Sequence, residues 1–510
     1  MIIPRPTEIH RRAGRFAIPS ALHLSADPGA QAAADLLAGY LGTGRPRTDT
    51  GPLIRLELSG DDGPPEAYRL TITTDAVTLT APAEAGLRHG VQTLRQLLPP
   101  STLNPATAPP DAWHWPNVTI TDAPRLPWRG VLLDVARHFM PLEFLYRFVD
   151  QLALHKLSVL HLHLTDDQGW RLEIDGWPRL TEVGAWRAET VIGHPGSTHF
   201  DGIRHGGYYT RSELRDLANY AARLGVTIVP EIDLPSHVRA ALAAYPELGN
   251  NPDRPLPVWT RFGISEDILN VREETLDFCR DVLDQVVSVF PAPWVHVGGD
   301  ECPTGQWAQD PLARQRAADL GLPDTDALRG WYVRQLDEFL TSRGRTTACW
   351  GEASEFGTLP PETLVMTWRD PTHGTRSIER GHPVVMAPYQ LTYFDYPQRD
   401  HPDEPLGQPG HVVTLSDVYG YEPLDGLPVF AGSGGVLGTQ AQLWTEYAPT
   451  PEHVEYLAYP RLCALAEIAW SAPPRDYGEF LDRLRAHERR LRALGVLSSV
   501  FPPSAEILKG

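Results

Sequence analysis

Residues 294–301 read WVHVGGDE, and this segment carries the pattern that decides the fold. A mostly apolar run is followed by two glycines and then by two adjacent carboxylates, Asp300 and Glu301. A short apolar run of this kind predicts a strand that is covered on both faces, as the strands of a parallel sheet are. In barrels of parallel strands, the functional groups lie where the strands end. The segment therefore predicts a buried strand that delivers two acids to a site.

Seven other segments share this strand-like character: GVLLDVA (130–136), VLHLHL (159–164), TIVPEID (227–233), TTACWGE (346–352), LVMTWR (364–369), PVVMAP (383–388) and GVLGTQAQLW (435–444). Helical patterns lie between many of them. In residues 210–225, for example, Thr210 and Glu213 form a capping box and Gly225 ends the helix. Eight strands that alternate with helices predict an α/β fold, a (β/α)8 TIM barrel. An open doubly wound sheet is the alternative, but the glycine-rich turn that usually follows its first strand is missing here.

The chain of 510 residues is long enough for two to three domains. Residues 66–82 alternate like paired strands and residues 84–98 have helical spacing, so we expect a small α+β domain over residues 1–125. The proline-rich stretch LPPSTLNPATAPPDAWHWPN (98–117) is typical of a linker. The barrel is expected over residues 126–475, and residues 476–510 should form a C-terminal helix packed on it.

The composition excludes several classes of partner. A net charge of −19 argues against binding to nucleic acid or to an anionic membrane. The sequence has no apolar run of about 18 residues, and its N-terminus does not resemble a secretory signal. The four cysteines lie far apart and outside any CxxC spacing, which indicates free thiols. We therefore expect a cytoplasmic protein.

Acids and tryptophans recur where the predicted strands end. Carboxylates accept hydrogen bonds from hydroxyl groups, and flat indole rings cover the apolar faces of a pyranose, so this combination favours a carbohydrate ligand. The residues at these ends are Arg137, His138, Asp166, Asp167, Glu231, Asp233, His237, Asp300, Glu301, Trp350, Glu352, Trp368, Arg369, Tyr393, Asp395, Trp444 and Glu446.

Five spaced motifs resemble those of the family 20 glycoside hydrolases, the β-N-acetylhexosaminidases: WRGVLLDVARHFMP, KLSVLHLHLTDDQGWRLEI, VPEIDLPSHVRAALAAYPEL, HVGGDE and LWTEY. The resemblance covers most of residues 66–471. It implies a (β/α)8 catalytic domain behind a small α+β domain, and retaining exo-hydrolysis of terminal β-linked N-acetylglucosamine or N-acetylgalactosamine in glycan or chitin breakdown. It also implies an oligosaccharide as the substrate, with no cofactor and no metal.

The resemblance further implies residue roles. Glu301 would be the general acid/base, Asp300 would orient the 2-acetamido group, and Tyr393 would hydrogen-bond its oxygen. The substrate-binding residues would be Arg137, Trp350, Trp368, Asp395, Tyr421, Trp444 and Glu446. His237 with Asp166, Asp167 and Asp233 would form a support network. Gly351 stands where the family often has an acid and Tyr421 where it often has tryptophan, which puts the preference for the leaving group in doubt.

The adjacency of Asp300 and Glu301 itself constrains the chemistry. Ordinary glycosidases place two carboxyls on opposite sides of the anomeric carbon, roughly 5 Å apart in retaining enzymes. Neighbouring residues cannot easily straddle a sugar in this way. If both enter one pocket, the nucleophile has to come from elsewhere, and the carbonyl oxygen of a 2-acetamido group can attack C1 to form an oxazolinium ion. Asp300 would stabilise that ion and Glu301 would protonate the leaving oxygen.

Other interpretations stay open. His161 and His163 could begin the metal site of a metal-dependent barrel hydrolase, or they could be hydrogen-bonded core histidines. The chain could release disaccharides, as lacto-N-biosidases do, or bind sugar without catalysis. Cys302, beside Glu301, is expected to be a packing residue. Residues 189–209 could form a mobile lid or an inert insertion.

Overall fold

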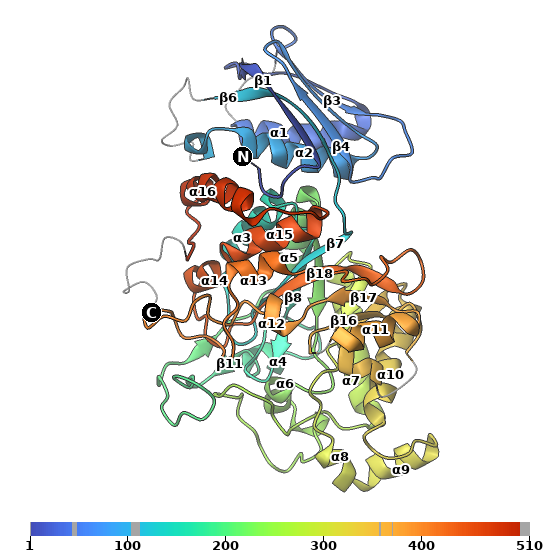
Figure 1. Cartoon of the computed structure of the whole chain (residues 1–510). Helices are drawn as coiled ribbons and strands as arrows, with labels where there is room; N and C mark the ends of the chain where they lie inside the picture. The colour runs from blue at the N-terminus through green and yellow to red at the C-terminus, as the bar shows by residue number, and fades with distance from the viewer. Residues whose placement is uncertain (1, 43–47, 104–112, 356–358, 370, 500–510) are drawn as a thin grey trace.

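A computed structural model describes residues 2–42, 48–103, 113–355, 359–369 and 371–499. It contains a mixed sheet with two helices at the N-terminal end of the chain and a closed barrel after it (Figure 1). Within the described part of the chain, we find no helix whose length and apolar character would let it cross a membrane.

The barrel consists of eight parallel strands that close in chain order. All eight overlap the predicted segments, so the prediction of a (β/α)8 barrel is confirmed. The strands are β7 (Trp128–Asp134), β8 (Val159–His163), β13 (Thr227–Glu231), β14 (Trp294–His296), β15 (Thr346–Trp350), β16 (Leu364–Thr367), β17 (Pro383–Met386) and β18 (Gly435–Leu443).

Helices surround this barrel on the outside (Figure 1). In α5 the Thr210 hydroxyl accepts from the Glu213 amide, the Glu213 carboxylate accepts from the Thr210 amide, and Gly225 follows in the left-handed conformation, as predicted. The outer helices are α3 (Leu142–Leu154), α5 (Arg211–Leu224), α7 (Glu273–Val289), α10 (Leu328–Ser342), α11 (Pro371–Glu379), α13 (Leu415–Gly420), α14 (Pro451–Ala458) and α15 (Arg461–Trp470).

Shorter elements decorate the loops between strands and helices. They are β9 (Thr165–Asp166), β10 (Gly169–Trp170), β11 (Trp186–Arg187), β12 (His205–Gly206), α4 (Arg179–Glu182), α6 (Arg239–Ala244), α8 (Gly305–Gln309), α9 (Pro311–Asp319), α12 (Tyr389–Thr392) and the 3-10 turns Pro28–Ala30, Pro100–Leu103, Pro246–Leu248 and Gly351–Glu355.

The N-terminal domain is a six-stranded sheet in the order β1-β6-β4-β5-β3-β2, with α1 and α2 packed against it (Figure 1). This confirms the predicted α+β domain. Its elements are β1 (Glu8–Ala17), β2 (His23–Ala26), α1 (Gln31–Leu41), β3 (Leu53–Leu58), β4 (Tyr68–Ile72), β5 (Ala76–Ala81), α2 (Glu84–Leu97) and β6 (His114–Asp122).

The linker prediction is wrong where it overlaps β6. Pro116 lies within this strand, which pairs with β1 and β4. Trp115 is fully buried, and its indole N–H donates to the Leu94 carbonyl. The prolines of residues 98–117 conceal a strand whose alternation becomes clear only when it is read on to Asp122. Residues 104–112 of the predicted linker lie outside the described residues.

A buried ion pair joins the two domains. Asp122, at the end of β6, accepts a hydrogen bond of 2.8 Å from the Lys156 ammonium, and neither side chain is exposed. The Tyr68 hydroxyl and the Trp470 indole N–H also donate to this carboxylate. Lys156 precedes β8 and Trp470 ends α15, so one N-terminal carboxylate collects donors from both domains.

The predicted C-terminal helix is present as α16 (Tyr477–Ala493), which lies between the barrel helices and the N-terminal domain (Figure 1). Arg483 of α16 pairs with Glu467 of α15 and donates to the carbonyl of Ile2. The helix therefore contacts the N-terminal segment as well as the barrel. Residues 500–510 of the expected C-terminal segment lie outside the described residues.

We expect Lys156→Met to lower the free energy of unfolding by about 3–5 kcal/mol, because the Asp122 carboxylate stays buried without its counter-charge. The double variant Lys156→Met, Asp122→Asn should lose less than the sum of the two single variants. Urea titrations followed by fluorescence measure both effects.

The matched control is Arg334→Met, which removes an exposed ion pair with Glu338 on one helix. Its cost should be less than about 1 kcal/mol. Equal losses for Lys156→Met and Arg334→Met would show that the buried pair does not stabilise the domain interface.

Candidate active site

A tight turn brings Asp300 and Glu301 into the same pocket. Strand β14 ends at His296, and the backbone is then left-handed at Gly298 (φ +70°), Gly299 (φ +89°) and Glu301 (φ +46°). A Cβ atom on Gly298 would lie 1.7 Å from an Asp233 oxygen. A side chain at positive φ costs about 1–2 kcal/mol, so Glu301 is held in this conformation by its surroundings. The turn explains how two neighbouring acids can face one ligand.

The pocket opens at the carboxyl ends of the barrel strands, as predicted. It contains every predicted catalytic residue, and every predicted substrate-binding residue except Tyr421. Its lining consists of Arg137, His163, Asp166, Asp233, His237, Asp300, Glu301, Trp350, Trp368, Tyr389, Tyr393, Asp395, Tyr396, Gln408, Trp444 and Glu446.

The prediction that Tyr421 binds substrate is wrong. Tyr421 directly follows α13 and packs against Val384, Met386 and Val436. These side chains face outward from β17 and β18, because Val385, between the first two, belongs to the core inside the barrel. Tyr421 therefore lies between the barrel wall and the outer helices, away from the pocket.

Two cationic side chains approach Glu301. The Arg369 guanidinium donates to one Glu301 oxygen at 2.9 Å, and the His237 imidazole Nε2 lies 3.7 Å from the other. The same His237 nitrogen is 3.9 Å from an Asp300 oxygen. His237 thus faces both acids of the pair, whereas Arg369 contacts only Glu301.

The four residues of the predicted support network, His237, Asp166, Asp167 and Asp233, lie together beside the acid pair. His237 Nδ1 lies 3.3 Å from an Asp166 oxygen and 3.6 Å from an Asp167 oxygen. Burial lowers the pKa of His237. The Asp166 carboxylate and the hydrogen bonds to Asp166 and Asp167 together raise it by more than burial lowers it, so the pKa lies well above its ordinary value. Asp167 does not line the pocket and accepts from the Arg239 amide, so it acts from behind.

A buried carboxylate, Glu231, lies below the pocket and organises the inside of the barrel. It accepts hydrogen bonds from His163 Nδ1 at 2.5 Å and from the Trp350 indole at 2.8 Å, and His161 Nε2 lies 3.2 Å away. A catalytic metal needs a ligand position open to substrate. His161 is fully buried and does not line the pocket. His163 does line it, but both of its ring nitrogens are hydrogen-bonded, one to Glu231 and the other to Asp166. This arrangement favours hydrogen-bonded core histidines over the metal-dependent hydrolase that the sequence left open.

The Asp300 carboxyl has an elevated pKa. Burial raises it most, the nearby Glu352 and Glu301 carboxylates raise it further, and the His237 cation opposes them, which brings the pKa to about 7. One Asp300 oxygen is buried with no hydrogen-bond partner among the described residues. Asp300 is therefore placed to exchange a proton near neutral pH and to accept a hydrogen bond from a ligand.

The Arg137 guanidinium marks the buried end of the pocket. It lies 2.8 Å from Asp166 and 3.7 Å from Glu446, and it is stacked 5.0 Å from the Trp444 ring. One oxygen of Asp395 and one of Glu446 are buried without a partner among the described residues. The Arg137 side chain is 9% exposed, whereas that of Arg369 is 46% exposed. The pocket therefore has a buried polar end and an open end beside Glu301.

Aromatic rings form the walls. Trp368 is stacked on Tyr393 with ring centroids 5.8 Å apart and planes at 22°. Trp444 lies 6.1 Å from Trp350 and 6.2 Å from Tyr393. Flat apolar faces beside unsatisfied carboxylates suit a pyranose, which has both C–H faces and hydroxyl groups.

The sequence analysis placed Arg369 and Glu352 at strand ends without giving them a role, and it missed Tyr389, Tyr396 and Gln408 of the pocket lining. Arg369 bridges Glu301 and Glu352, and the Glu352 carboxylate also accepts from the Trp368 indole. The signal for both was their position at the strand ends. Gln408 and Tyr396 come from an irregular loop without periodicity, so no sequence pattern points to them. Residues 189–209, the possible lid, do not line the pocket.

Two family models match the chain. Glycosyl hydrolase family 20, catalytic domain, matches residues 126–473, and glycosyl hydrolase family 20, domain 2, matches residues 1–123. The β-hexosaminidase of Porphyromonas gingivalis is 37% identical over 430 residues, which cover 82% of this chain but only 52% of that protein. The chain thus spans about half the length of this relative. The β-hexosaminidase of Vibrio furnissii is 34% identical, with 91% and 76% covered.

Solved structures of glycosidases that remove N-acetylhexosamines are also similar to this chain. The exo-β-N-acetylglucosaminidase from Vibrio harveyi in complex with N-acetylglucosamine has a TM-score of 0.85 and 30% identity, with 98% of this chain and 78% of that chain covered. A mutant Streptomyces plicatus β-hexosaminidase in complex with the product GlcNAc has a TM-score of 0.82 and 32% identity, with 99% and 97% covered.

The turn geometry predicts that Gly298→Ala will be more destabilising than a comparable change elsewhere. The control Gly321→Ala also has a positive φ (+66°), but its Cβ would meet no atom within 4 Å. The control should cost about 1–2 kcal/mol from backbone strain, and Gly298→Ala roughly 1–3 kcal/mol more, because its methyl group overlaps Asp233. Urea unfolding compares the two, and losses of equal size would contradict this description of the turn.

Proposed function

We propose, because the chain belongs to glycosyl hydrolase family 20, that the protein is an exo-acting, retaining β-N-acetylhexosaminidase. It removes terminal β-linked N-acetylglucosamine, and N-acetylgalactosamine, from an oligosaccharide. The observation that carries this proposal is the entry of Asp300 and Glu301, adjacent in sequence, into one pocket lined by tryptophans and buried carboxylates. This arrangement provides a proton donor for the leaving group and an acceptor for the acetamide.

In the first step, the acetamido carbonyl oxygen of the substrate attacks C1. The Asp300 carboxylate accepts the amide N–H, and its interaction strengthens as positive charge develops on the forming oxazolinium ion. The Tyr393 hydroxyl donates to the acetamido oxygen and fixes its direction of attack. Glu301 transfers its proton to the glycosidic oxygen as the bond to C1 breaks.

In the second step, Glu301 takes a proton from a water molecule that attacks C1. The oxazolinium ring opens and the acetamido group is regenerated. Two displacements at C1 return the sugar with retained configuration. Family 20 is a recognised exception to the rule that two carboxyls flank the scissile bond.

The buried end of the pocket selects a terminal sugar residue. Arg137, Asp395 and Glu446 bind the ring hydroxyls, and Trp350, Trp368 and Trp444 cover the faces of the ring. The open end beside Glu301 and Arg369 leaves the remaining chain in solvent. Because the polar groups at the other end are buried, this geometry favours release of one sugar over release of a disaccharide.

We also propose that the protein acts in a reducing compartment, the cytoplasm. The support is that all four cysteines are buried as free thiols. Reduced, inaccessible thiols are usual in cytosolic proteins.

The proposed reaction predicts an absolute need for the acetamide. A nitrophenyl β-N-acetylglucosaminide should be hydrolysed more than about a thousandfold faster than the matching β-glucoside, because only the former brings its own nucleophile. The ratio of kcat/KM values measures this. Comparable rates on both substrates would overturn the mechanism.

Glu301→Gln tests the role of the general acid separately. Loss of a general acid should reduce turnover of an N-acetylglucosaminide with a poor leaving group by roughly 10²–10⁴-fold, and turnover with a good leaving group by much less. An equal loss on both would show that Glu301 does not protonate the leaving oxygen.

The raised pKa of Asp300 predicts an acidic limb in the pH profile of kcat/KM near pH 7. The reaction needs Asp300 as the anion, so the rate falls as the pH drops through this pKa. Glu352→Gln removes a negative neighbour, which stabilises the Asp300 anion and should move the limb to lower pH. Glu355, on the same turn, is not among the main groups that act on this pKa, so Glu355→Gln should leave the limb in place. A limb that stays fixed in Glu352→Gln would contradict this description.

A further inference from the structure

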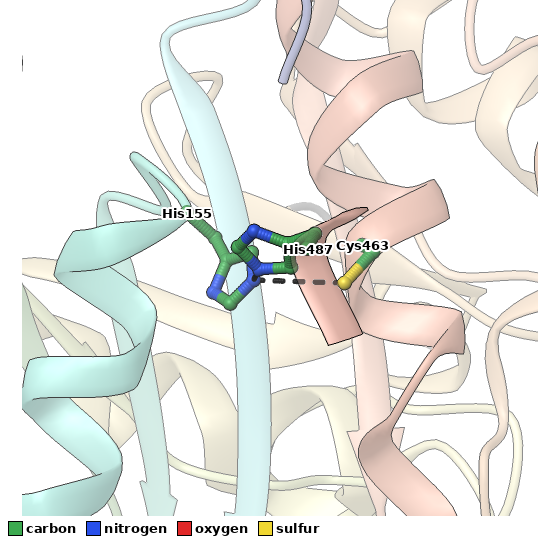
Figure 2. A group of neighbouring side chains, drawn as sticks. All are labelled: His155, Cys463 and His487. Atoms are coloured by element: carbon green, nitrogen blue, oxygen red, sulfur yellow. Dashed lines mark hydrogen bonds between the residues drawn. The ribbon is translucent and has the colours of Figure 1, made fainter. Parts of the chain in front are cut away.

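Three buried side chains from three separate helical segments meet outside the pocket (Figure 2). His155 follows α3, Cys463 lies on α15 and His487 lies on α16. The two Nε2 atoms are 2.8 Å apart, and the Cys463 sulfur is 3.5 Å from His155 Nε2. All three side chains are at most 1% exposed. The cluster therefore gathers three metal-ligand atoms at one buried point.

The hydrogen bonds fix the direction of the lone pairs. His155 Nδ1 lies 2.7 Å from the Gln151 carbonyl, which can only accept, so the neutral ring carries its proton on Nδ1. The lone pair of His155 Nε2 then faces both His487 and Cys463. A hydrogen bond of this kind, from Nδ1–H to a backbone carbonyl, orients the ring of many metal-binding histidines.

The cluster is poorly satisfied by hydrogen bonding alone. His487 must donate from Nε2 to His155, because two lone pairs 2.8 Å apart would repel each other. Its Nδ1 is buried with no partner among the described residues. The contact of 3.5 Å to the thiol is a weak hydrogen bond at best. The three buried polar side chains thus have two good hydrogen bonds, one to the Gln151 carbonyl and one between the imidazoles, and His487 Nδ1 and the thiol are left poorly paired, although buried polar groups are costly unless they are paired.

We propose that Cys463, His155 and His487 bind a structural zinc ion. Tetrahedral zinc, with Zn–N of about 2.0–2.1 Å and Zn–S of about 2.3 Å, places its ligand atoms roughly 3.3–3.6 Å from one another. The 3.5 Å between the Cys463 sulfur and His155 Nε2 already matches, whereas the two imidazole nitrogens, 2.8 Å apart, have to separate by roughly half an ångström. One thiolate with two imidazoles is a donor set that suits zinc.

The proton balance of binding is simple. Cys463 releases its thiol proton and forms the Zn–S bond. The proton on His487 Nε2 moves to Nδ1, so that Nε2 can bind the metal, and this exchange sacrifices only the bond to His155. One proton leaves for each zinc bound.

The position of the site indicates a role in stability. It lies beside the end of α3 that leads into β8, at the amino-terminal face of the barrel, whereas the pocket opens at the carboxyl ends of the strands. The metal would join α16 to α3 and α15. Removing it should change the thermal midpoint and leave kcat unaltered.

The test measures the metal content of the full chain produced in medium supplemented with zinc. Wild-type protein, after exhaustive dialysis, should retain about one zinc per chain, and Cys463→Ser and His487→Gln roughly tenfold less. The matched control is Cys279→Ser, which removes a thiol that is equally buried and lies 3.4 Å from the Tyr332 hydroxyl. It should retain the metal. Production with Co²⁺ instead should give the thiolate-to-cobalt absorption of a tetrahedral site in wild type and in Cys279→Ser alone.

The thermal midpoint supplies a second readout. Wild type produced with zinc should unfold at a higher temperature than wild type produced without it, and Cys463→Ser should show no such difference. Retention of zinc in both ligand variants, or its absence from wild type, would overturn the proposal. Neither result would bear on the glycosidase activity, which depends on the opposite face of the barrel.

Discussion

The pocket depends on a row of buried side chains whose charges alternate in sign. Glu231 holds His163, His163 lies 2.9 Å from Asp166, and Asp166 holds His237, which faces Glu301. Their pKa values move in the directions that keep every member charged: those of the two carboxylates are lowered and those of the two histidines are raised. Each ion is buried only because its neighbour carries the opposite sign. The position of the acid is thus set by a chain of ions that begins in the centre of the barrel.

The sequence was informative wherever function follows strand ends. The eight apolar runs predicted the barrel, and its known polarity predicted that acids and tryptophans distant in sequence would share one rim. The capping box of α5 was equally legible, because its two side chains bond to amides only three residues away. Local chemistry and a strict topology together make such features predictable.

The misses have a common physical cause. Tyr421 was placed in the pocket by its place in a motif, but the course of the loop after α13 decides where it points, and loops lack periodicity. Arg369 lies directly after a predicted wall residue, and its contact with Glu301 depends on a rotamer that no pattern encodes. The strand β6 was not predicted because proline usually indicates a loop. A strand can contain Pro116 at a position where no backbone N–H has to donate. The left-handed backbone at Glu301 likewise arises from tertiary packing rather than from local preference.

The ion pair between Asp122 and Lys156 has a consequence for how this protein can be divided. A gene for the barrel alone would encode an ammonium group whose carboxylate resides on the other piece, together with an indole N–H that has lost its acceptor. A gene for the N-terminal domain alone would leave the Asp122 carboxylate without the Lys156 ammonium. The two domains are therefore expected to fold poorly when each is combined with an unrelated partner domain, although each has a hydrophobic core of its own. Recombination between relatives would have to exchange Asp122, Lys156 and Trp470 together.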